Sequence, residues 1–389
     1  MGLLDADGGH RARHGEVPLS TRKLAVCLLL LAACGGDAPV APPPPSSESL
    51  AALADSPGAD RTRLAHAIDA VFDAETVGET HALLVMRGGS IVAERYAPGY
   101  DAQTRFLGWS MAKCVTAIVV GQLVSDGRLR LDRTAPVPAW QRTGDPRGEI
   151  TLRHLLQMRS GLRHREGGEP IYSADTPRML FLEGRDDTAR FAEAQPLEAE
   201  PGEQFNYSTP STMILADLAT RALTERTEPK ARQAAMSDYL QTRFFGPAGM
   251  ESAVAEYDAA GTMLGSSYVH ANARDWAKLG EFLRNKGSVR GNQVIPRRWI
   301  EFMLTPSPTE DAYGAQVWLN RTRSTDRPQV LFPERAPENV FACLGHMGQY
   351  VLGSPDQKLT VVRLGASTEE QQETLRHRMG DLVTLFPGI

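Results

Sequence analysis

A single helical segment places the strongest constraint on how this chain can fold. Residues 106–127 read "FLGWSMAKCVTAIVVGQLVSDG", and the nearly unbroken apolar run over 114–120 predicts a buried helix. Ser110 and Lys113 lie one turn apart at its start, and Gly127 suits the left-handed position that ends a helix. A buried ammonium group is costly unless it is paired or loses its proton. The segment therefore predicts a lysine beside a serine in a dry site, either paired with an acid or kept neutral as a base.

The rest of the chain combines strand signals at both ends with helical signals between them. Residues 64–72 have helical spacing, and two apolar runs on either side of Gly88-Gly89 predict a hairpin. Mostly helical signals and long loops fill about 133–250, and strand signals gather over 315–364. This order predicts an α+β fold, in which an antiparallel β-sheet is flanked by helices and joined by a mostly helical subdomain.

Size, charge and histidine spacing narrow the classes of function. The 389 residues, of which 42% are hydrophobic, suffice for two domains or one large composite domain. A net charge of -5 and the lack of a Lys/Arg-rich run argue against nucleic acid as a partner. The nine histidines form no His-x-x-x-His or His-Glu-x-x-His pattern, so we expect neither a metal nor another cofactor.

The N-terminus resembles a bacterial lipoprotein signal. Arg22 and Lys23 precede a short apolar run, and Cys34 follows in "LLAACGGD". The run is too short to span a bilayer as a helix. The resemblance implies that Cys34 is lipidated and becomes the new N-terminus. The alternative is a secretory signal cleaved after the small residues. Both predict export to the bacterial cell envelope, and the first adds a lipid anchor in a membrane.

Changes in composition along the chain suggest domain boundaries. Residues 1–34 form the predicted signal peptide, and 35–58 form a Pro/Ala/Ser-rich linker. The folded domain then covers 59–389, with the helical insertion at about 133–250. The oligomeric state is left open by the sequence.

Two of the four cysteines, Cys114 and Cys343, belong to the predicted domain. They could form a disulfide in an oxidising compartment. However, Cys114 falls inside a predicted buried helix, and two cysteines do not make a disulfide framework. We therefore expect both to be free thiols.

Three short patches contain residues that could perform chemistry. The first is Ser110-x-x-Lys113, where a desolvated lysine could take the proton of a serine and the start of the helix could face a developing oxyanion. The pattern alone is weak, because "STRK" at 20–23 matches it too, and a structural N-cap is the alternative.

The other two patches have equally plain structural interpretations. Tyr207-Ser208-Thr209 precedes a predicted helix and could be a turn with an N-cap. His346 lies between Gly345 and Gly348 in "FACLGHMGQYVLG", which could be a hairpin corner with a surface histidine.

Taken in order, the three patches resemble the motifs of serine β-lactamases and penicillin-binding proteins. "SMAK", "YST" and "HMG" match Ser-x-x-Lys, Tyr-x-Asn and the His-x-Gly variant of Lys-Thr-Gly. Three further segments, "ITLRHLLQMRSGL", "PGEQFNYS" and "FGPAGM", are also similar to sequence segments typical of this family. The resemblance covers about 82–364 and is nearest the branch of 6-aminohexanoate-dimer hydrolase and the class C-like esterases. It implies a β-lactamase/transpeptidase-like fold.

The resemblance also implies catalytic roles. Ser110 would be the acyl-forming nucleophile, Lys113 its base or proton relay, and Tyr207 the second proton carrier. The backbone N–H groups of Ser110 and Gln349 would form the oxyanion hole. The implied activity is a serine hydrolase that acts on an ester or amide through an acyl-enzyme.

Substrate-binding residues are implied less directly. His346 and Gly348 would bind substrate, and Tyr172 would match a substrate-side tyrosine, with a plain packed tyrosine as the alternative. Two positions depart from the family pattern, since Thr209 replaces the asparagine and His346 replaces the lysine. Both departures disfavour efficient β-lactam hydrolysis, because the asparagine amide and the lysine charge would hold the β-lactam.

Other functions have weaker claims. A β-lactamase or D-amino-acid peptidase is the first alternative, and a non-catalytic ligand-binding lipoprotein of the same fold is the second. An α/β-hydrolase would need a strand leading into "GWSMA", a late histidine such as His346 or His377, and a parallel sheet, which the strand order does not supply.

Overall fold

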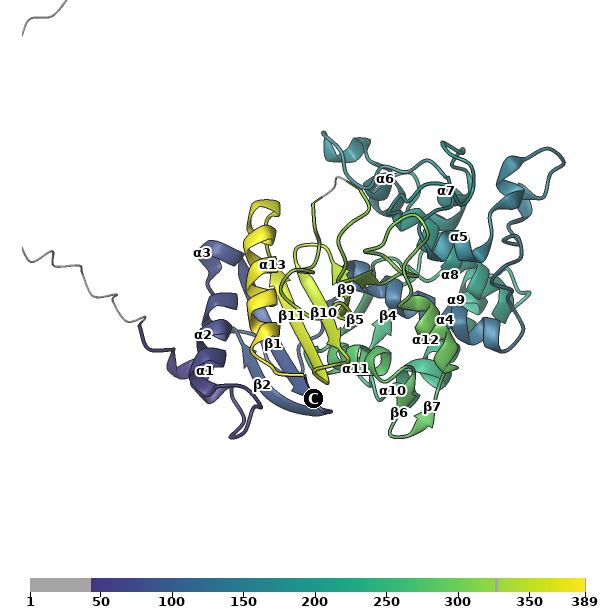
Figure 1. Cartoon of the computed structure of the whole chain (residues 1–389). Coiled ribbons are helices and arrows are strands. Elements are labelled where there is room, and N and C mark those ends of the chain that lie inside the picture. Colours follow the sequence, from purple (N-terminus) through teal and green to yellow (C-terminus); the bar gives the residue numbers. More distant parts are fainter. Residues whose placement is uncertain (1–42, 326–327, 389) are drawn as a thin grey trace, which may run out of the picture. The chain divides into compact units, whose positions relative to one another are not determined.

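The computed structural model describes residues 43–325 and 328–388 (Figure 1). The predicted signal peptide and Cys34 lie outside these ranges. Within them, no helix is both long and apolar enough to cross a membrane.

The centre of the fold is a sheet of antiparallel strands in the order β2-β1-β11-β10-β9-β8. The strands are β1 (Glu79–Arg87), β2 (Ser90–Tyr96), β8 (Trp318–Leu319), β9 (Phe341–Gly345), β10 (Gln349–Ser354) and β11 (Leu359–Ala366). The hairpin around Gly88-Gly89 forms as predicted, and β1 pairs with β11, so strands from both ends of the domain meet at the middle of the sheet.

Both faces of the sheet are buried, which explains its apolar sequences. Successive side chains of a strand point to opposite faces. Ala82 and Leu84 of β1 join the hydrophobic core that includes α4 and α8, whereas Leu83 and Val85 join a second core.

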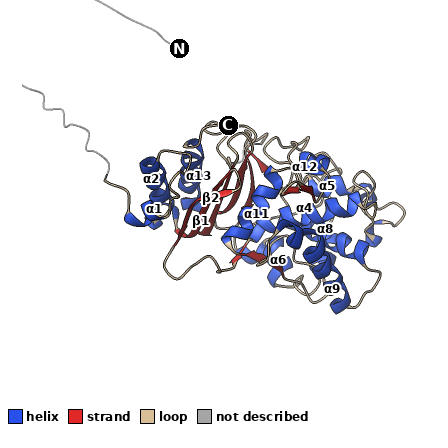
Figure 2. Ribbon diagram, turned by 90° about the horizontal axis from the view of Figure 1, so that it is seen from below, coloured by secondary structure: helices blue, strands red, loops and turns tan. Residues whose placement is uncertain are grey.

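Helices cover each face (Figures 1 and 2). Those that contribute to the second core are α2 (Arg61–Val71), α13 (Glu369–Thr384) and the short α3 (Ala74–Val77), and the short α1 (Ser47–Ala51) packs against α2. The amphipathic α11 (Ala273–Arg284) packs on the other face, within the first core.

The helical subdomain lies beside the sheet and carries most of the remaining elements. Its helices are α4 (Ala112–Ser125), α5 (Leu152–Leu156), α6 (Asp175–Phe181), α7 (Thr188–Glu193), α8 (Thr209–Leu223), α9 (Pro229–Tyr239), the π-helical turn η5 (Leu240–Phe245), α10 (Gly246–Ala248) and α12 (Arg297–Met303). The 3-10 turns are η1 (Trp109–Met111), η2 (Pro138–Trp140), η3 (Pro146–Glu149) and η4 (Ile171–Ser173). Small sheets are formed by β3 (Phe106–Leu107), β4 (Val254–Ala255) and β5 (Val269–Ala271), and by β6 (Ser288–Val289) and β7 (Asn292–Gln293).

The predicted buried helix is α4, which runs through the core. Nearly all of its side chains are inaccessible to solvent, and Gly127 takes the expected left-handed conformation after it, with φ of 74°. Gly121 permits close packing, because a Cβ there would overlap the Trp299 indole, whose Nε1 donates to the Ala117 carbonyl at 3.1 Å. The α+β prediction is confirmed, and the helices α5 to α10 occupy the predicted insertion.

The folded region begins before residue 59. Helix α1 lies inside the stretch predicted as linker, and Ser46 and Ser49 hydrogen-bond to Asp69 of α2. Leu53 forms a β-bridge with Ala93 and is buried.

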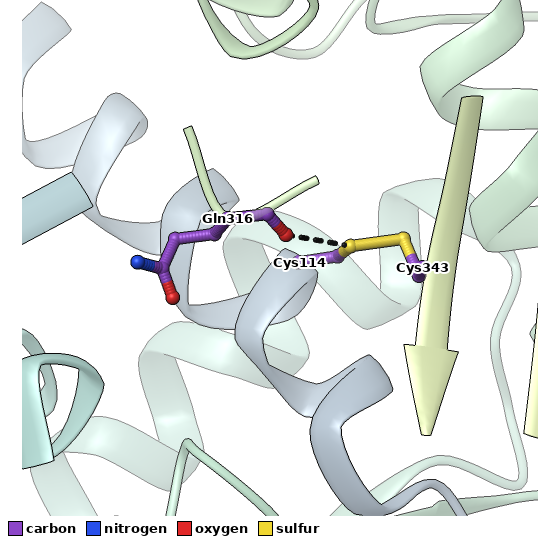
Figure 3. The surroundings of a disulfide bond; sticks show 3 residues. All are labelled: Cys114, Gln316 and Cys343. Carbon is purple, nitrogen blue, oxygen red and sulfur yellow. Dashed lines mark hydrogen bonds between the residues drawn. A yellow bond between two sulfur atoms is a disulfide. The ribbon is translucent and has the colours of Figure 1, made fainter. Parts of the chain in front are cut away.

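The expectation of two free thiols is wrong, because Cys114 and Cys343 form a disulfide (Figure 3). Cys114 is buried in α4 as expected, but its side chain faces β9, where Cys343 lies. The bridge joins residues 229 positions apart whose Cα atoms are 6.2 Å apart. The Gln316 carbonyl oxygen contacts the Cys114 sulfur at 3.2 Å, and because a bridged sulfur carries no hydrogen, this contact is not a donated hydrogen bond.

Candidate active site

Ser110 lies in the 3-10 turn η1 that leads directly into α4. Its neighbour Trp109 has φ of 48°, a left-handed conformation that is strained for a bulky residue and tends to occur at functional sites. Ring contacts hold Trp109 in place, with centroids 6.1 Å from Tyr268 and 5.3 Å from His346. The fold therefore fixes the backbone that presents the partly exposed Ser110.

Lys113 is the most buried charged group near Ser110, with 1% of its surface exposed. Its Nζ donates to Ser110 Oγ at 2.9 Å, to Thr209 Oγ1 at 3.1 Å and to the Ser266 carbonyl at 3.1 Å. Burial lowers the pKa of Lys113 to about 8, although the negative charge of Glu166 acts in the opposite direction. The predicted dry site with a lysine beside the serine is confirmed.

Tyr207 lies close to both Lys113 and Ser110. The Lys113 Nζ is 5.1 Å from the centre of the Tyr207 ring, which stacks on Trp318 at 5.5 Å and meets Tyr313 edge-on at 6.0 Å. Burial raises the pKa of Tyr207 far above its ordinary range, and the charge of Glu166 raises it further, against a hydrogen bond with Ser110 that lowers it. Tyr207 is therefore a protonated phenol at neutral pH.

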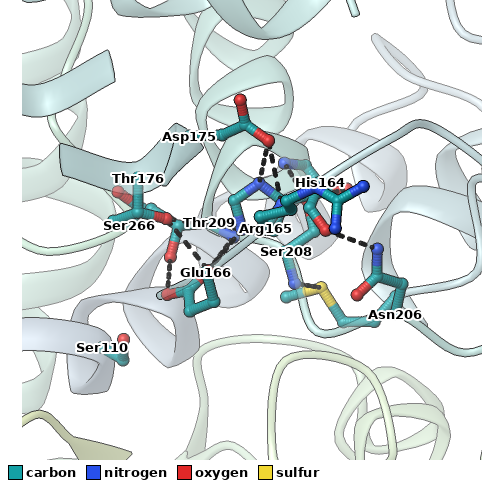
Figure 4. Close-up of polar contacts among 12 residues, drawn as sticks. Ser110, His164, Arg165, Glu166, Asp175, Thr176, Asn206, Ser208, Thr209 and Ser266 are labelled. Carbon is teal, nitrogen blue, oxygen red and sulfur yellow. Dashed lines mark hydrogen bonds and ion pairs between the residues drawn. The ribbon is translucent and has the colours of Figure 1, made fainter. Parts of the chain in front are cut away.

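The Tyr-x-Thr segment ends in the N-terminus of α8. Ser208 caps that helix by accepting from the Ser211 N–H at 3.2 Å, which agrees with the capping interpretation of this residue. Thr209 has a different partner. Its hydroxyl lies 2.6 Å from Glu166 Oε1, and its N–H donates to Glu166 Oε2 at 3.2 Å (Figure 4).

Glu166 was not identified from the sequence, because "RHREGGEP" has the composition of an ordinary polar loop. Its carboxylate also accepts from His164 Nε2 at 2.6 Å and from Thr176 Oγ1 at 3.0 Å. Partial burial raises the pKa of Glu166, but the His164 hydrogen bond and the positive charge of Lys113 outweigh it and lower the pKa to about 2. An ionised carboxylate therefore faces the site.

The His346-Met347-Gly348 segment forms the turn between β9 and β10. Met347 and Gly348 both have positive φ, 61° and 78°. The buried Arg363 holds the turn from β11, where its Nη1 donates to the carbonyls of Gly348 at 2.9 Å and Met347 at 3.2 Å. Burial lowers the pKa of Arg363 to about 10, so it remains charged at neutral pH.

Gln349 connects the same turn to the sheet. Its side-chain amide donates to the His346 carbonyl at 3.0 Å and accepts from the Gly365 N–H at 3.0 Å, while its backbone pairs with Gly345 at the start of β10. Gly345 passes very close to the Gly108 carbonyl, just before η1, where a Cβ on Gly345 would collide. The turn and η1 are thus neighbours, although the predicted role of Gln349 in an oxyanion hole stays a prediction.

The structure therefore brings Ser110, Lys113 and Tyr207 into one cluster and places His346 beside Trp109. Tyr172 is different, since it lies in η4 with 65% of its surface exposed. It is not the packed tyrosine of the alternative interpretation, and its contact with substrate stays a prediction. No cluster of three or more potential metal ligands occurs among the residues that the structure describes.

Fold and site together define a serine hydrolase of the β-lactamase/transpeptidase-like class. The model of the Beta-lactamase family matches residues 69–385, and the chain belongs to that family. The sequence is 26% identical over 240 residues to the 6-aminohexanoate-dimer hydrolase of Paenarthrobacter ureafaciens. This match covers 59% of the chain and 58% of that relative's length.

Solved structures are similar over a larger share of the chain. A Bacillus anthracis protein assigned as a 6-aminohexanoate-dimer hydrolase has a TM-score of 0.63 and 23% identity, covering 81% of each chain. A family VIII carboxylesterase has a TM-score of 0.56 and 16% identity, covering 81% of this chain and 96% of its own. These similarities confirm the predicted fold.

Proposed function

We propose that the protein hydrolyses short-chain esters or small amides through an acyl-enzyme on Ser110. The observation that carries this proposal is the 2.9 Å contact between Lys113 Nζ and Ser110 Oγ, made by a lysine whose pKa burial lowers to about 8. At that pKa a fraction of Lys113 is neutral at physiological pH and can accept the serine proton.

The proposed first step transfers the Ser110 hydroxyl proton to Lys113 while Oγ attacks the substrate carbonyl. The backbone N–H groups of Ser110 and Gln349 are the proposed donors to the oxyanion. Tyr207 is protonated, so it suits the role of a proton donor or carrier toward the leaving alcohol or amine. Water then attacks the acyl-enzyme and gives up a proton to the same groups, which pass that proton to Ser110 Oγ as the carboxylic acid leaves.

Two features favour esters and simple amides over β-lactams. The Thr209 hydroxyl is already engaged by Glu166 and Lys113, so it offers no amide to a β-lactam's acylamino group. His346 is exposed on its turn and provides a weaker anchor for a carboxylate than lysine does. The carboxylesterase of similar fold and the 6-aminohexanoate-dimer hydrolase relative suggest the same substrate classes.

The test compares kcat/KM for p-nitrophenyl acetate, p-nitrophenyl butyrate, 6-aminohexanoate dimer, a D-amino-acid peptide and nitrocefin. We expect an ester or the small amide to exceed nitrocefin by about 10²-fold or more, since each lost polar anchor costs about 1–3 kcal/mol. Ser110→Ala is the matched control and should abolish turnover of every substrate. A clear preference for nitrocefin would favour the β-lactamase alternative and contradict the proposal.

Covalent labelling separates the enzyme from a non-catalytic binding protein of the same fold. A fluorophosphonate probe should label the parent protein at Ser110 and leave Ser110→Ala unlabelled. An unlabelled, inactive and folded parent would contradict the proposed chemistry.

Export and lipid anchoring belong to the same proposal. The lipoprotein-like sequence that ends at Cys34 supports attachment to a membrane of the bacterial cell envelope, with the catalytic domain outside the cytoplasm. A disulfide between Cys114 and Cys343 agrees with an oxidising compartment.

A further inference from the structure

The hydroxyl of Thr209 links the catalytic lysine to a carboxylate outside the three family motifs. Thr209 Oγ1 lies 3.1 Å from Lys113 Nζ and 2.6 Å from Glu166 Oε1. An ionised carboxylate can only accept hydrogen bonds, so the single hydroxyl hydrogen of Thr209 points to Glu166. The oxygen lone pair of Thr209 therefore faces Lys113, which has to be the donor in that contact.

Glu166 is held in one orientation by donors from three directions. One oxygen accepts from the Thr209 hydroxyl, and the other from the Thr209 N–H, from Thr176 Oγ1 and from His164 Nε2 (Figure 4). Because Glu166 is ionised, the hydrogen of the 2.6 Å contact with His164 lies on Nε2. Behind it, His164 Nδ1 lies 4.0 Å from Asp175 Oδ2. A carboxylate restrained in this way can impose a fixed hydrogen-bond direction on Thr209.

We propose that Glu166 is a positioning residue which acts through the Thr209 hydroxyl, directs Lys113 toward Ser110 and sets the pH at which Lys113 loses its proton. The proposal rests on the proposed role of Lys113 as the base. In this arrangement Thr209 takes the place of the motif's asparagine and presents a hydroxyl oxygen, rather than a side-chain amide, to the lysine.

Among the described groups that face Lys113, Glu166 supplies the charge that affects the protonation of Lys113. Ser110 and Tyr207 are neutral hydroxyls, Thr209 presents an oxygen lone pair, and the loop between β4 and β5 contributes the carbonyl of Ser266. Glu166 contributes the negative charge that stabilises the ammonium form against burial. Loss of that charge should therefore make Lys113 easier to deprotonate.

The direct test follows the titration of Lys113 by NMR of protein labelled with ¹³C at the lysine side chains. The chain contains only six lysines, and the resonance of Lys113 can be assigned by its absence in Lys113→Arg. Glu166→Gln keeps the shape of the side chain and removes its charge. We expect it to lower the midpoint of the Lys113 titration by about 1 unit, at the low end of the usual range for a neighbouring charge. The low end applies because 38% of the Glu166 side chain is exposed to screening by water.

Variants of Thr209 test the link itself. Thr209→Val removes the hydroxyl that accepts from the ammonium, and we expect the Lys113 midpoint to fall as it does in Glu166→Gln. Thr209→Ser restores the hydroxyl and should return the midpoint to within a few tenths of a unit of the parent value. The acid limb of kcat/KM for p-nitrophenyl acetate should move with the NMR midpoint in each variant.

Glu169→Gln is the matched control, because it removes an exposed charge from the same loop. It should leave the midpoint unchanged. An unchanged Lys113 midpoint in both Glu166→Gln and Thr209→Val would overturn the proposal, even if activity fell, since a purely structural role lowers rates without moving the titration. The titration does not depend on turnover, so a parent protein that fails to label at Ser110 would contradict the proposed function and leave this result interpretable.

Discussion

Removal of the Cys114–Cys343 disulfide should destabilise the domain strongly. The bridge ties α4, which carries Lys113, to β9, which leads into the His346 turn. Both cysteines are buried, with at most 1% of their surface exposed, so the bond lies in the core and not on the surface.

The magnitude follows from the length of chain that the bridge closes. The separation of 229 residues gives a chain-entropy contribution of about 5 kcal/mol at 25 °C. Measured effects of disulfides are more often about 2–4 kcal/mol, since the unfolded chain retains some structure. We expect the free energy of unfolding of the double variant Cys114→Ala/Cys343→Ala to fall by about 2–5 kcal/mol.

Urea unfolding followed by tryptophan fluorescence measures this loss. The parent should unfold at a higher urea concentration without reductant than with it. Reductant reaches the buried bridge only in the unfolded chain, where breaking the bridge removes its constraint and favours unfolding. The double variant should not respond to reductant. The bridge is refuted if peptide mapping of unreduced protein finds Cys343 alkylated, and its stabilising role is refuted if parent and variant unfold at the same urea concentration.

Two further predictions concern catalysis and attachment. Burial lowers the pKa of Lys113 to about 8, and the base has to be neutral, so kcat/KM for an ester should rise with pH up to about 8 and then level off. Lys113→Ala should lower kcat/KM by about 10²–10⁴-fold. A parent protein whose kcat/KM does not change with pH would contradict the assignment of Lys113 as the base. Cys34→Ser should move the protein from the membrane to the soluble fraction of the expressing cells, and unchanged membrane association would contradict lipid anchoring.

The sequence predicted those parts of the fold whose signals are local. The apolar run of α4, the hairpin at Gly88-Gly89 and the helical signals within 133–250, where α8 lies, all correspond to elements of the structure. Helix α13 had a signal that was not used. Thr368 and Gln371 form a capping box, and Leu375 and Met379 begin an apolar face at helical spacing.

Other features depend on contacts between segments that are distant in the sequence, so no local sequence pattern predicts them. The proximity of Cys114 to Cys343 follows from the packing of α4 beside β9. Glu166 reaches the site because the loop after α5 folds over the start of α8, which only the tertiary structure reveals. The strand signal at "AQVWLN" also gave only the two-residue β8 at the sheet edge, where a single neighbouring strand supplies the pairing.

Thr209 illustrates how the structure changes the meaning of a motif departure. In the sequence, its replacement of asparagine indicated only a missing amide for substrate. In the structure its one hydroxyl hydrogen is committed to Glu166 and a lone pair to Lys113, so the residue has no donor left for a substrate carbonyl. We therefore infer that this position serves the lysine instead of the acyl group and that discrimination between substrates comes from other residues, for which the exposed Tyr172 and the His346 turn are our proposed candidates.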